Sequence, residues 1–554
     1  IINHCILFRR EELMSQRLLH TPEGVRDVSG SELERKRNLE DTLRKSIKAC
    51  GYQEVQTPTF EYFDVFSGEI GNTHSSELYK FFDKEGNTLV LRPDFTPSLA
   101  RYASQRFAGE EKALRLCYQG NTFTNMGSLQ GKLKETTQIG AECYGDGSVE
   151  SEAEMITMLI SALKTAGLTD FQISIGHVGY FKGICEKANF NQDTENLIKE
   201  AILDKNIFLV ENTIDDLQTE EGLSTALKAM TELYGDVSVL EKADSLVTNA
   251  VSKNAIAHLQ SLYHMLCEKQ VENYVSFDLG ILSKYNYYTG IVFQAFADGV
   301  GDSIAKGGRY DNLLKSFGNP KPAIGFAIMV DDVLTALTNP QTEDKYITFA
   351  LGKGRLADKT LALLKEIGIT CEEMEDKSTR KLIFVNEELK LKFFLAKGPD
   401  VPTYVEYGAA DIGVVGKDTI LEENRNVFEV LDLGFGKCRM CVCGPESARE
   451  LLNRHERIRV ASKYPKIAKE YFFDERHQTV DIIKLNGSVE LGPIVELSDV
   501  IVDIVETGST LKENGLVVLE EICPLSARMI VNQVSMRMNY KRITDIIYKL
   551  KEKL

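Results

Sequence analysis

The stretch Val500–Val505 is apolar except for Asp503, and it runs directly into the loop ETGST at residues 506–510. A buried strand, a loop of small residues and a helix start thus follow one another. Such a loop directs backbone N–H groups and hydroxyls at a phosphate, whose charge the helix N-terminus also favours. A buried ionised aspartate is costly unless it is satisfied, and ribose hydroxyls or Mg²⁺ suit it. The pattern predicts a sugar-phosphate cradle in which Asp503 and Glu506 hold the sugar.

The same spacing has a purely structural alternative. In that case Thr510 and Glu513 form a helix-capping box, and Gly508 makes a turn. Spacing alone does not separate the two interpretations.

A second candidate phosphate site is LGKGRL at residues 351–356, between an apolar strand and an amphipathic helix. Lys353 and Arg355 flank a glycine there, and the functional interpretation is that they contact diphosphate or triphosphate oxygens. A solvated basic turn is the alternative. Two further strands each end in a lysine beside a turn, at Lys417 and Lys463, and NGSVE at 486–490 adds one carboxylate.

Regular elements must position these residues. From Tyr346 onward, apolar strands alternate with helical segments at short intervals, which is typical of open α/β lobes with parallel strands. Upstream, residues 31–50 predict a helix with a Ser31/Glu34 capping box and one apolar face. From about 191 to 269 the pattern is largely helical, which indicates a helical insertion in an α+β domain. Residues 339–345 are the best candidate for a linker.

Bulk properties exclude some classes of function. With 82 acidic and 65 basic residues among 554, the net charge of −17 argues against a broad nucleic-acid-binding surface. Residues 1–13 hold an apolar run too short for a signal peptide or a membrane span, so we interpret them as an upstream extension and expect them to be disordered. Eleven scattered cysteines and no export signal predict reduced thiols and a cytoplasmic location. Cys438, Cys441 and Cys443 make an incomplete zinc set, and we predict no metal held by protein ligands alone.

Five C-terminal segments, in the order LGKGRL, DIGVVGKD, RVASKYP, NGSVEL and VDIVETGSTL, resemble the ATP phosphoribosyltransferase family. The resemblance covers residues 346–554. It implies two α/β lobes like those of periplasmic binding proteins, lobe one at about 346–436 plus 524–554 and lobe two at about 437–523. It implies that ATP is joined to phosphoribosyl diphosphate (PRPP), with release of diphosphate, in the first step of histidine biosynthesis. Mg²⁺ on the leaving group is the expected cofactor.

The resemblance also implies roles for individual residues. The catalytic set is Lys353, Arg355, Asp503 and Glu506. The PRPP-binding set is Asp503, Glu506, Thr507, Gly508, Ser509 and Thr510, and the ATP-binding set is Lys353, Gly354, Arg355, Lys417, Ser462, Lys463 and Glu490. One departure is Glu496, where the family signature usually has glycine. The chain ends at Leu554 without the C-terminal regulatory domain of the long form, so it resembles the short form.

Residues 21–338 resemble the catalytic core of histidyl-tRNA synthetase. The matching segments are TPEGVRD (21–27), LRPDFTPSLAR (91–101), QIGAE (138–142), YYTG (287–290), KGGRYDNL (306–313) and AIGFAI (323–328). The expected fold is therefore an α+β class II aminoacyl-tRNA-synthetase-like antiparallel-sheet domain, about 14–338, followed by the two-lobed α/β transferase.

The residues that carry synthetase chemistry are replaced. Thr124 stands in place of the arginine that grips ATP, and Ser283 and Asp332 stand in place of two further arginines. Losing these guanidinium groups removes bidentate phosphate recognition, so amino-acid activation is expected to be absent.

The amino-acid pocket keeps its polar set, with carboxylates for the ammonium and imidazole groups of histidine and tyrosines for the ring. The set is Asp94, Thr96, Gln138, Glu142, Tyr287 and Tyr288. For any one of these residues, ordinary maintenance of the fold is the alternative.

This combination resembles the regulatory subunit of short-form ATP phosphoribosyltransferase, fused here ahead of the transferase. Fusion fixes a one-to-one ratio and raises the effective concentration of one module at the other. We expect feedback inhibition by L-histidine and a homodimer or homotetramer. Alternatives are an N-terminal module that acts only as an activating scaffold, an active histidyl-tRNA synthetase, and a solute receptor without catalysis. The three replaced residues argue against an active synthetase. The ETGST loop, which resembles a PRPP-binding loop, argues against a solute receptor.

Overall fold

The chain divides into two compact units. The structure is a computed structural model that describes residues 19–67, 73–107, 109, 112–127, 131–217, 219–282, 287–339, 345–374, 381–454 and 457–554. The first unit comprises residues up to Leu203 and Phe208–Gln341, and the second comprises Asp204–Ile207 and Thr342–Leu554. The predicted extension 1–13, residues 340–344 of the predicted linker and Ser283 lie outside the described residues.

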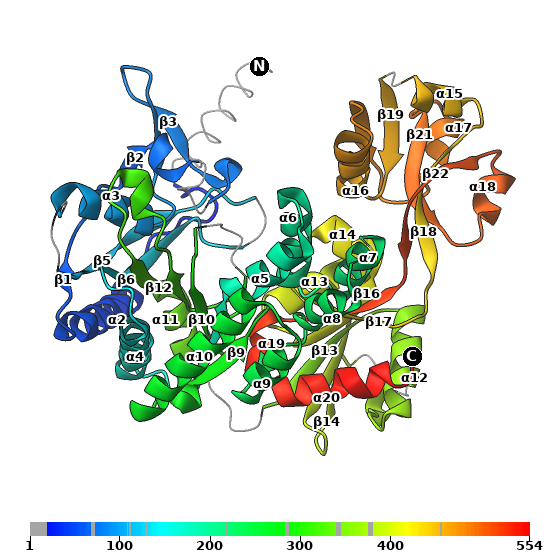
Figure 1. The fold of residues 1–554 in the computed structure, drawn as a ribbon. Helices are drawn as coiled ribbons and strands as arrows, with labels where there is room; N and C mark the ends of the chain where they lie inside the picture. Colours follow the sequence, from blue (N-terminus) through cyan, green and yellow to red (C-terminus); the bar gives the residue numbers. More distant parts are fainter. Residues whose placement is uncertain are drawn as a thin grey trace. The chain divides into compact units, whose positions relative to one another are not determined.

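The first unit is built on a largely antiparallel sheet, which confirms the predicted class II fold (Figure 1). In the described part of the chain the sheet has nine strands in the order β1-β5-β6-β12-β11-β10-β7-β9-β8. Their bounds are β1 (Gln53–Glu54), β5 (Leu114–Phe123), β6 (Glu135–Tyr144), β7 (Phe171–His177), β8 (Tyr234–Gly235), β9 (Val275–Asp278), β10 (Ile291–Ala297), β11 (Ala305–Arg309) and β12 (Ala323–Met329). The strands β5, β6, β12, β11, β10 and β7 pair antiparallel in series.

Helices cover one face of this sheet. They are α2 (Gly30–Ala49), α4 (Val149–Thr165), α10 (Ala250–Glu268) and α11 (Val330–Thr338). Because strand side chains alternate between faces, Ile139 and Ala141 of β6 join the apolar core beneath these helices. Glu142 therefore lies on the opposite face, where a separate apolar cluster includes Tyr118 and the helix α3 (Thr96–Arg106).

Two local predictions have different outcomes. The helix predicted at 31–50 exists as Gly30–Ala49, with Leu39, Leu43 and Ile47 buried as the pattern indicates. The Ser31/Glu34 capping box is wrong, because Ser29 is the N-cap residue and no side chain caps this helix. Gly30 has φ +57°, a left-handed backbone that glycine adopts readily, so the chain enters the helix before Ser31.

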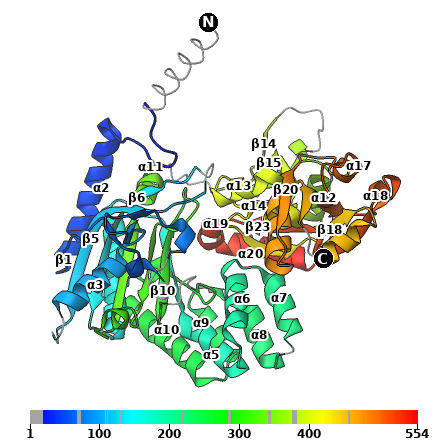
Figure 2. The same cartoon turned by 90° about the horizontal axis from the view of Figure 1, so that it is seen from above.

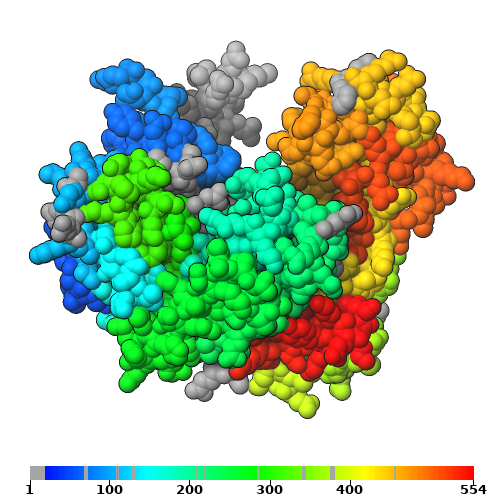
Figure 3. All heavy atoms as spheres, in the orientation of Figure 1, coloured from blue at the N-terminus to red at the C-terminus, as the bar shows by residue number. Residues whose placement is uncertain are grey.

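The helical insertion is present. It contains α6 (Gln192–Leu203), α7 (Ile207–Asp216), α8 (Glu221–Ala229) and α9 (Ser238–Ser245), and it follows α5 (Val178–Ala188) and leads into α10. In Figure 2 these helices lie together at one end of the first unit. In Figure 3 residues of this stretch, coloured teal to green, form a continuous part of its surface.

The second unit has two α/β lobes, as predicted, but each sheet combines parallel with antiparallel pairs, so the expectation of parallel strands holds only in part. In its described residues, a six-stranded sheet has the order β14-β15-β13-β16-β23-β17, and a five-stranded sheet has the order β20-β19-β21-β18-β22. The first, lobe one, contains β13 (Ile347–Gly352), β14 (Ile383–Asn386), β15 (Leu391–Ala396), β16 (Ile412–Gly416), β17 (Phe428–Asp432) and β23 (Ala527–Val531). The second, lobe two, contains β18 (Cys438–Gly444), β19 (Ile458–Ser462), β20 (Val480–Lys484), β21 (Val500–Val505) and β22 (Val517–Leu525).

Short helices follow the strands of both lobes. Lobe one carries α12 (Arg355–Glu366), α13 (Val401–Glu406), α14 (Lys417–Glu423), α19 (Gln533–Met538) and α20 (Tyr540–Lys551). Lobe two carries α15 (Ala448–Asn453), α16 (Pro465–Glu470), α17 (Leu491–Ile494) and α18 (Ser509–Glu513). Each lobe has an apolar core of its own.

Neither a membrane span nor a protein-only metal cluster occurs among the described residues. No helix in that part of the chain is both long and apolar enough to cross a bilayer. No group of three or more His, Cys, Asp and Glu side chains in the same part could hold a metal ion. Cys438, Cys441 and Cys443 lie along β18 as free thiols, and the last two are buried.

Glu496 occupies a backbone conformation that explains why glycine is usual there. Its φ is +61°, and its carbonyl oxygen accepts a hydrogen bond of 2.8 Å from Arg459 Nη1. A non-glycine residue in the left-handed region costs about 1–2 kcal/mol. We therefore expect Glu496→Gly to raise the free energy of unfolding of the second unit by about 1 kcal/mol in urea titrations.

The matched control is Glu496→Ala, which removes the exposed carboxylate but keeps a Cβ atom. It is expected to give no gain. If alanine and glycine stabilised the unit equally, the destabilisation at position 496 would come from the Glu496 charge and not from the left-handed backbone.

Candidate active site and regulatory pocket

The ETGST loop has the geometry of an anion cradle. Strand β21 ends at Val505, and Gly508, with φ +75°, is the N-cap residue of α18. The hydroxyls of Thr507 and Ser509 lie 3.1 Å apart on this turn. The N–H groups of a helix's first turn have no intrahelical partner and favour an anion. The capping-box alternative is wrong, because the helix begins at Ser509 and no side chain caps it. Thr510 lies inside this helix.

Asp503 is the half-buried carboxylate of β21. Burial, with a smaller contribution from the nearby Glu490 carboxylate, raises its pKa to about 6, and the Ile504 N–H and Lys463 oppose the shift. At neutral pH the group is therefore largely ionised, yet it is held in surroundings that favour a hydrogen-bonding or cationic partner. The structure thus gathers Asp503, Glu490 and Lys463 from separate segments of lobe two.

The two predicted phosphate segments meet. Arg355, the first residue of α12, directs Nη2 to Glu506 at 3.1 Å, although 151 residues separate them. Gly354 is the N-cap residue with φ +99°, and Lys353 is exposed on the same turn. Both members of the ion pair are more than half exposed, with 66% and 54% of their side chains accessible. Substrate phosphates can therefore compete for the guanidinium.

Two predicted ATP contacts are engaged within the protein. The Lys417 ammonium pairs with the buried Glu429, which also lies 3.5 Å from Arg528. Ser462 is fully buried, donates to the Val502 carbonyl at 2.7 Å and accepts from the Tyr464 N–H at 2.8 Å. These contacts give both residues a part in positioning the strand ends. The neighbouring Lys463 is exposed.

In the first unit, Glu142 is the centre of a cluster of buried polar side chains. It is 1% exposed and accepts hydrogen bonds from Thr96 Oγ1 at 2.8 Å and from the Tyr310 hydroxyl. Burial raises its pKa to about 8, so the carboxyl is mostly protonated at neutral pH. Glycine opposite it is required, because a Cβ atom on Gly325 would lie 1.5 Å from Glu142 Oε2.

Three of the other predicted residues, Asp94, Thr96 and Tyr287, lie near this carboxyl. Asp94 Oδ1 accepts the Thr96 N–H at 3.1 Å, and the rings of Tyr287 and Tyr288 stack with centroids 4.3 Å apart. Tyr287 also contacts Tyr310 edge to face, with centroids 5.8 Å apart.

Sequence reasoning missed Tyr118 and Tyr310. Tyr310 lies within the matched segment KGGRYDNL, and Tyr118 pairs with Gly140 across the strands, two residues from Glu142. Within the described part of the chain, Tyr118 Oη and Gln138 Oε1 are buried without a hydrogen-bond partner. Buried polar atoms are nearly always satisfied, so both fit contacts to a polar ligand.

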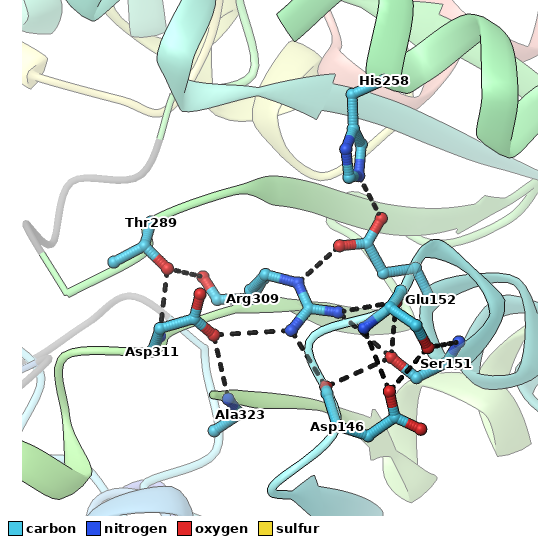
Figure 4. A network of polar contacts seen from close by, with 9 residues as sticks. Asp146, Ser151, Glu152, His258, Thr289, Arg309, Asp311 and Ala323 are labelled. Carbon is cyan, nitrogen blue, oxygen red and sulfur yellow. Dashed lines mark hydrogen bonds and ion pairs between the residues drawn. The ribbon is translucent and has the colours of Figure 1, made fainter. Parts of the chain in front are cut away.

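A buried ion-pair network supports the loop that carries the two tyrosines (Figure 4). Arg309 Nε donates to Glu152 Oε1 at 2.5 Å, and His258 Nε2 lies 2.6 Å from Glu152 Oε2. The Arg309 carbonyl accepts the Thr289 N–H at 2.8 Å, and the Thr289 hydroxyl accepts the Asp311 N–H at 3.0 Å. The network thus ties helices α4 and α10 to the residue after Tyr288.

The nucleotide positions of the synthetase carry no guanidinium at the two sites the structure describes. Thr124 bonds through its backbone N–H to the Lys134 carbonyl at 2.9 Å. Asp332 lies in the first turn of α11, where burial, with Asp302 nearby, raises its pKa to about 6. A carboxyl group there opposes a triphosphate instead of binding it.

Comparison with known proteins gives the same division of the chain. The family model described as histidyl-tRNA synthetase matches residues 24–333, and that described as ATP phosphoribosyltransferase matches residues 397–552. An ATP phosphoribosyltransferase of Lachnoclostridium phytofermentans is 73% identical over 210 residues, which are 38% of this chain and 98% of the relative.

The first unit has relatives that occur as separate proteins. An ATP phosphoribosyltransferase regulatory subunit of Ruminiclostridium cellulolyticum is 39% identical over 324 residues, 58% of this chain and 77% of the relative. The same organism has a distinct ATP phosphoribosyltransferase, 58% identical over 210 residues, 38% of this chain and 98% of that relative. A crystal structure titled as an ATP phosphoribosyltransferase regulatory subunit/histidyl-tRNA synthetase from Bacillus halodurans C is 28% identical, with a TM-score of 0.55. The match covers 68% of this chain and 98% of that one.

The fold and the sites define a two-lobed phosphoribosyltransferase that follows a class II synthetase-like module. The chain belongs to the histidyl-tRNA synthetase family over its first unit and to the ATP phosphoribosyltransferase family over its second. It is an ATP phosphoribosyltransferase, which joins ATP to PRPP in the first step of histidine biosynthesis, and it is not a tRNA synthetase.

Proposed function

We propose that free L-histidine binds in the Glu142 pocket of the first unit and slows phosphoribosyl transfer in the second. The observation that carries this proposal is the cluster of buried polar side chains around Glu142. A buried carboxyl held by Thr96 and Tyr310 lies near the buried Tyr118 hydroxyl, which has no hydrogen-bond partner among the described residues. An ammonium or imidazolium group would satisfy them, while Asp332 opposes the nucleotide that aminoacylation needs.

The transferase mechanism follows from positioning and charge. N1 of adenine is a competent nucleophile without a strong base, so N1 attacks C1 of the ribose. The N1–C1 bond forms as the C1–O bond breaks, and diphosphate leaves with the electron pair. Asp503 and Glu506 hold the ribose hydroxyls and stabilise the cation-like transition state. Lys353, Arg355 and Lys463 bind phosphate oxygens, and the loop Thr507–Thr510 holds the 5′-phosphate.

The residues present fit Mg²⁺ as a substrate-bound cofactor. Asp503 and Glu490 lie close enough for their charges to interact, and a divalent cation at the substrate relieves that repulsion. Bound Mg²⁺ neutralises charge on the leaving diphosphate. Asp503, Glu490 and Glu506 are the carboxylates that would face it.

Glu142→Gln is the test of the regulatory role. It should raise the histidine concentration for half-inhibition by about 10- to 100-fold, because a hydrogen bond to a charged group contributes about 1.5–3 kcal/mol. In the parent enzyme, inhibition by histidine should become stronger from pH 6 to 8, because Glu142 ionises over this range. The Glu142→Gln variant should show no such trend. The readout is formation of phosphoribosyl-ATP at fixed ATP and PRPP.

The control is Glu154→Gln, which removes a carboxylate from the outer side of α4, where it pairs with Arg115 at 3.0 Å. Its inhibition should equal that of the parent. Unchanged inhibition in Glu142→Gln would refute the proposal that histidine binds at Glu142. A parent enzyme indifferent to histidine would leave the first unit as an activating scaffold.

A further inference from the structure

The two lobes of the transferase are connected by two passages of the chain and also by a contact between helices. The chain passes from lobe one to lobe two after β17 and returns between β22 and β23. The two passages run side by side, because the Ala527 N–H donates to the Phe435 carbonyl at 2.9 Å. Gly434 and Gly436 on the first passage have φ of +69° and +68°. Two adjacent strands of this kind form a hinge and do not by themselves fix the opening between the lobes.

Helix α14 of lobe one makes a third connection. Its Asp418, Leu421 and Glu422 share one helical face, since positions i, i+3 and i+4 lie on the same side. Asp418 Oδ2 accepts the Tyr464 hydroxyl of lobe two at 3.2 Å. Leu421 packs against the apolar core of lobe two.

Glu422 makes the strongest part of this contact. Its carboxylate accepts the Lys466 N–H at 3.1 Å and the Ile467 N–H at 3.1 Å. These are the N–H groups of the first turn of α16, where an acceptor is otherwise lacking. The Lys466 ammonium returns the contact by donating to the Leu421 carbonyl at 3.2 Å. Burial raises the pKa of Glu422, and the two N–H groups oppose that shift.

The contact lies directly beside the reacting groups. Helix α16 follows Ser462, Lys463 and Tyr464, and Ser462 is bonded to the Val502 carbonyl, one residue before Asp503. Lys463 is near enough to Asp503 to lower its pKa against the effect of burial. A shift of α16 relative to α14 would therefore move these groups relative to Lys353 and Arg355 of lobe one.

We propose that the α14 face formed by Asp418, Leu421 and Glu422 is an interlobe clamp that sets how far the two lobes of the transferase open. Glu422 and Asp418 are positioning residues of the reaction. They touch no substrate and act by holding the loop that carries Lys463. The clamp belongs to the established transferase activity and is tested without histidine, so the outcome does not depend on the proposed regulation.

The test compares Glu422→Ala with Glu423→Ala. Both remove one carboxylate from α14, but among the described residues Glu423 makes no hydrogen bond or ion pair to α16. In Glu422→Ala, hydrogen exchange of a peptide spanning 463–470 should rise about tenfold or more, and kcat/KM for PRPP should fall about tenfold. Glu422→Gln keeps one acceptor oxygen and should recover to within about threefold of the parent. Glu423→Ala should leave both quantities within about twofold.

Each outcome decides the proposal. Faster exchange with unchanged kcat/KM would make the contact merely structural and overturn the clamp. Unchanged exchange would show that the contact does not hold the lobes, which also overturns it. If Glu422→Ala fails to fold, Tyr464→Phe replaces it. That change removes the hydroxyl on Asp418, keeps the buried ring, and should lower kcat/KM about threefold with faster exchange of the same peptide.

Discussion

Replacing Asp503 by asparagine is expected to lower kcat/KM for PRPP by about 10²- to 10³-fold in a chain that stays folded. That is the usual loss when one preorganised group facing transition-state charge is removed. The carboxylate of Asp503 is half-buried on β21, and we expect its replacement by the isosteric amide to affect the reaction far more than folding. Steady-state rates at saturating ATP, with PRPP varied, measure it.

The pH profile gives a second and independent signature. The pKa of Asp503 is about 6, and the proposed role of this residue requires the ionised form. In the parent, kcat/KM for PRPP should therefore rise as pH increases from 5 to 7 and then level off. In Asp503→Asn the same range should be flat.

Asp481→Asn is the matched control for Asp503. Asp481 lies on β20 of the same sheet and pairs at the surface with Arg457 at 2.8 Å. Its replacement should leave kcat/KM within about twofold, since exposed ion pairs contribute little. A variant at Asp503 that keeps more than about a third of the parental rate would remove this residue from the catalytic set.

Replacing Arg309 by methionine is expected to destabilise the first unit by about 3–5 kcal/mol. Arg309 is 5% exposed and Glu152 is fully buried, so the change leaves a buried carboxylate without its main partner. Urea titrations followed by circular dichroism would measure the loss. Histidine affinity should fall as well, because the Arg309 network fixes the segment that carries Tyr287 and Tyr288.

Two further variants distinguish the contribution of the buried ion pair to stability from that of an ion pair near the surface. Arg115→Met breaks the partly exposed pair with Glu154 and should cost less than about 1 kcal/mol. The double change Arg309→Met with Glu152→Leu removes both charges and should recover more than half of the single loss. A cost below about 1 kcal/mol for Arg309→Met would mean that the network does not hold this part of the fold.

Local sequence determined much of this protein. Apolar runs ending in glycine-rich loops predict the strand–loop–helix cradle at Gly508 and the turn at Gly354, because such signals act within a few residues. The helix at 30–49, the helical insertion and the alternation of strands and helices in the transferase are local patterns of the same kind. The matching motifs indicated the families of the two units, whereas the periodicity of apolar residues indicated only the type of each element. The oligomeric state stays a prediction.

Tertiary structure decided which candidates share a site. The pairing of Arg355 with Glu506 joins residues 151 positions apart, and no periodic pattern encodes that distance. The sequence suggests that Lys417 is a phosphate ligand. In the folded chain Lys417 instead pairs with the buried Glu429, because the packing of the strands brings the two side chains together. Tyr310, Tyr118 and the clamp at Glu422 escaped sequence reasoning for the same reason. Their roles arise from contacts between elements remote in the chain, and such contacts exist only once the sheets and helices have packed.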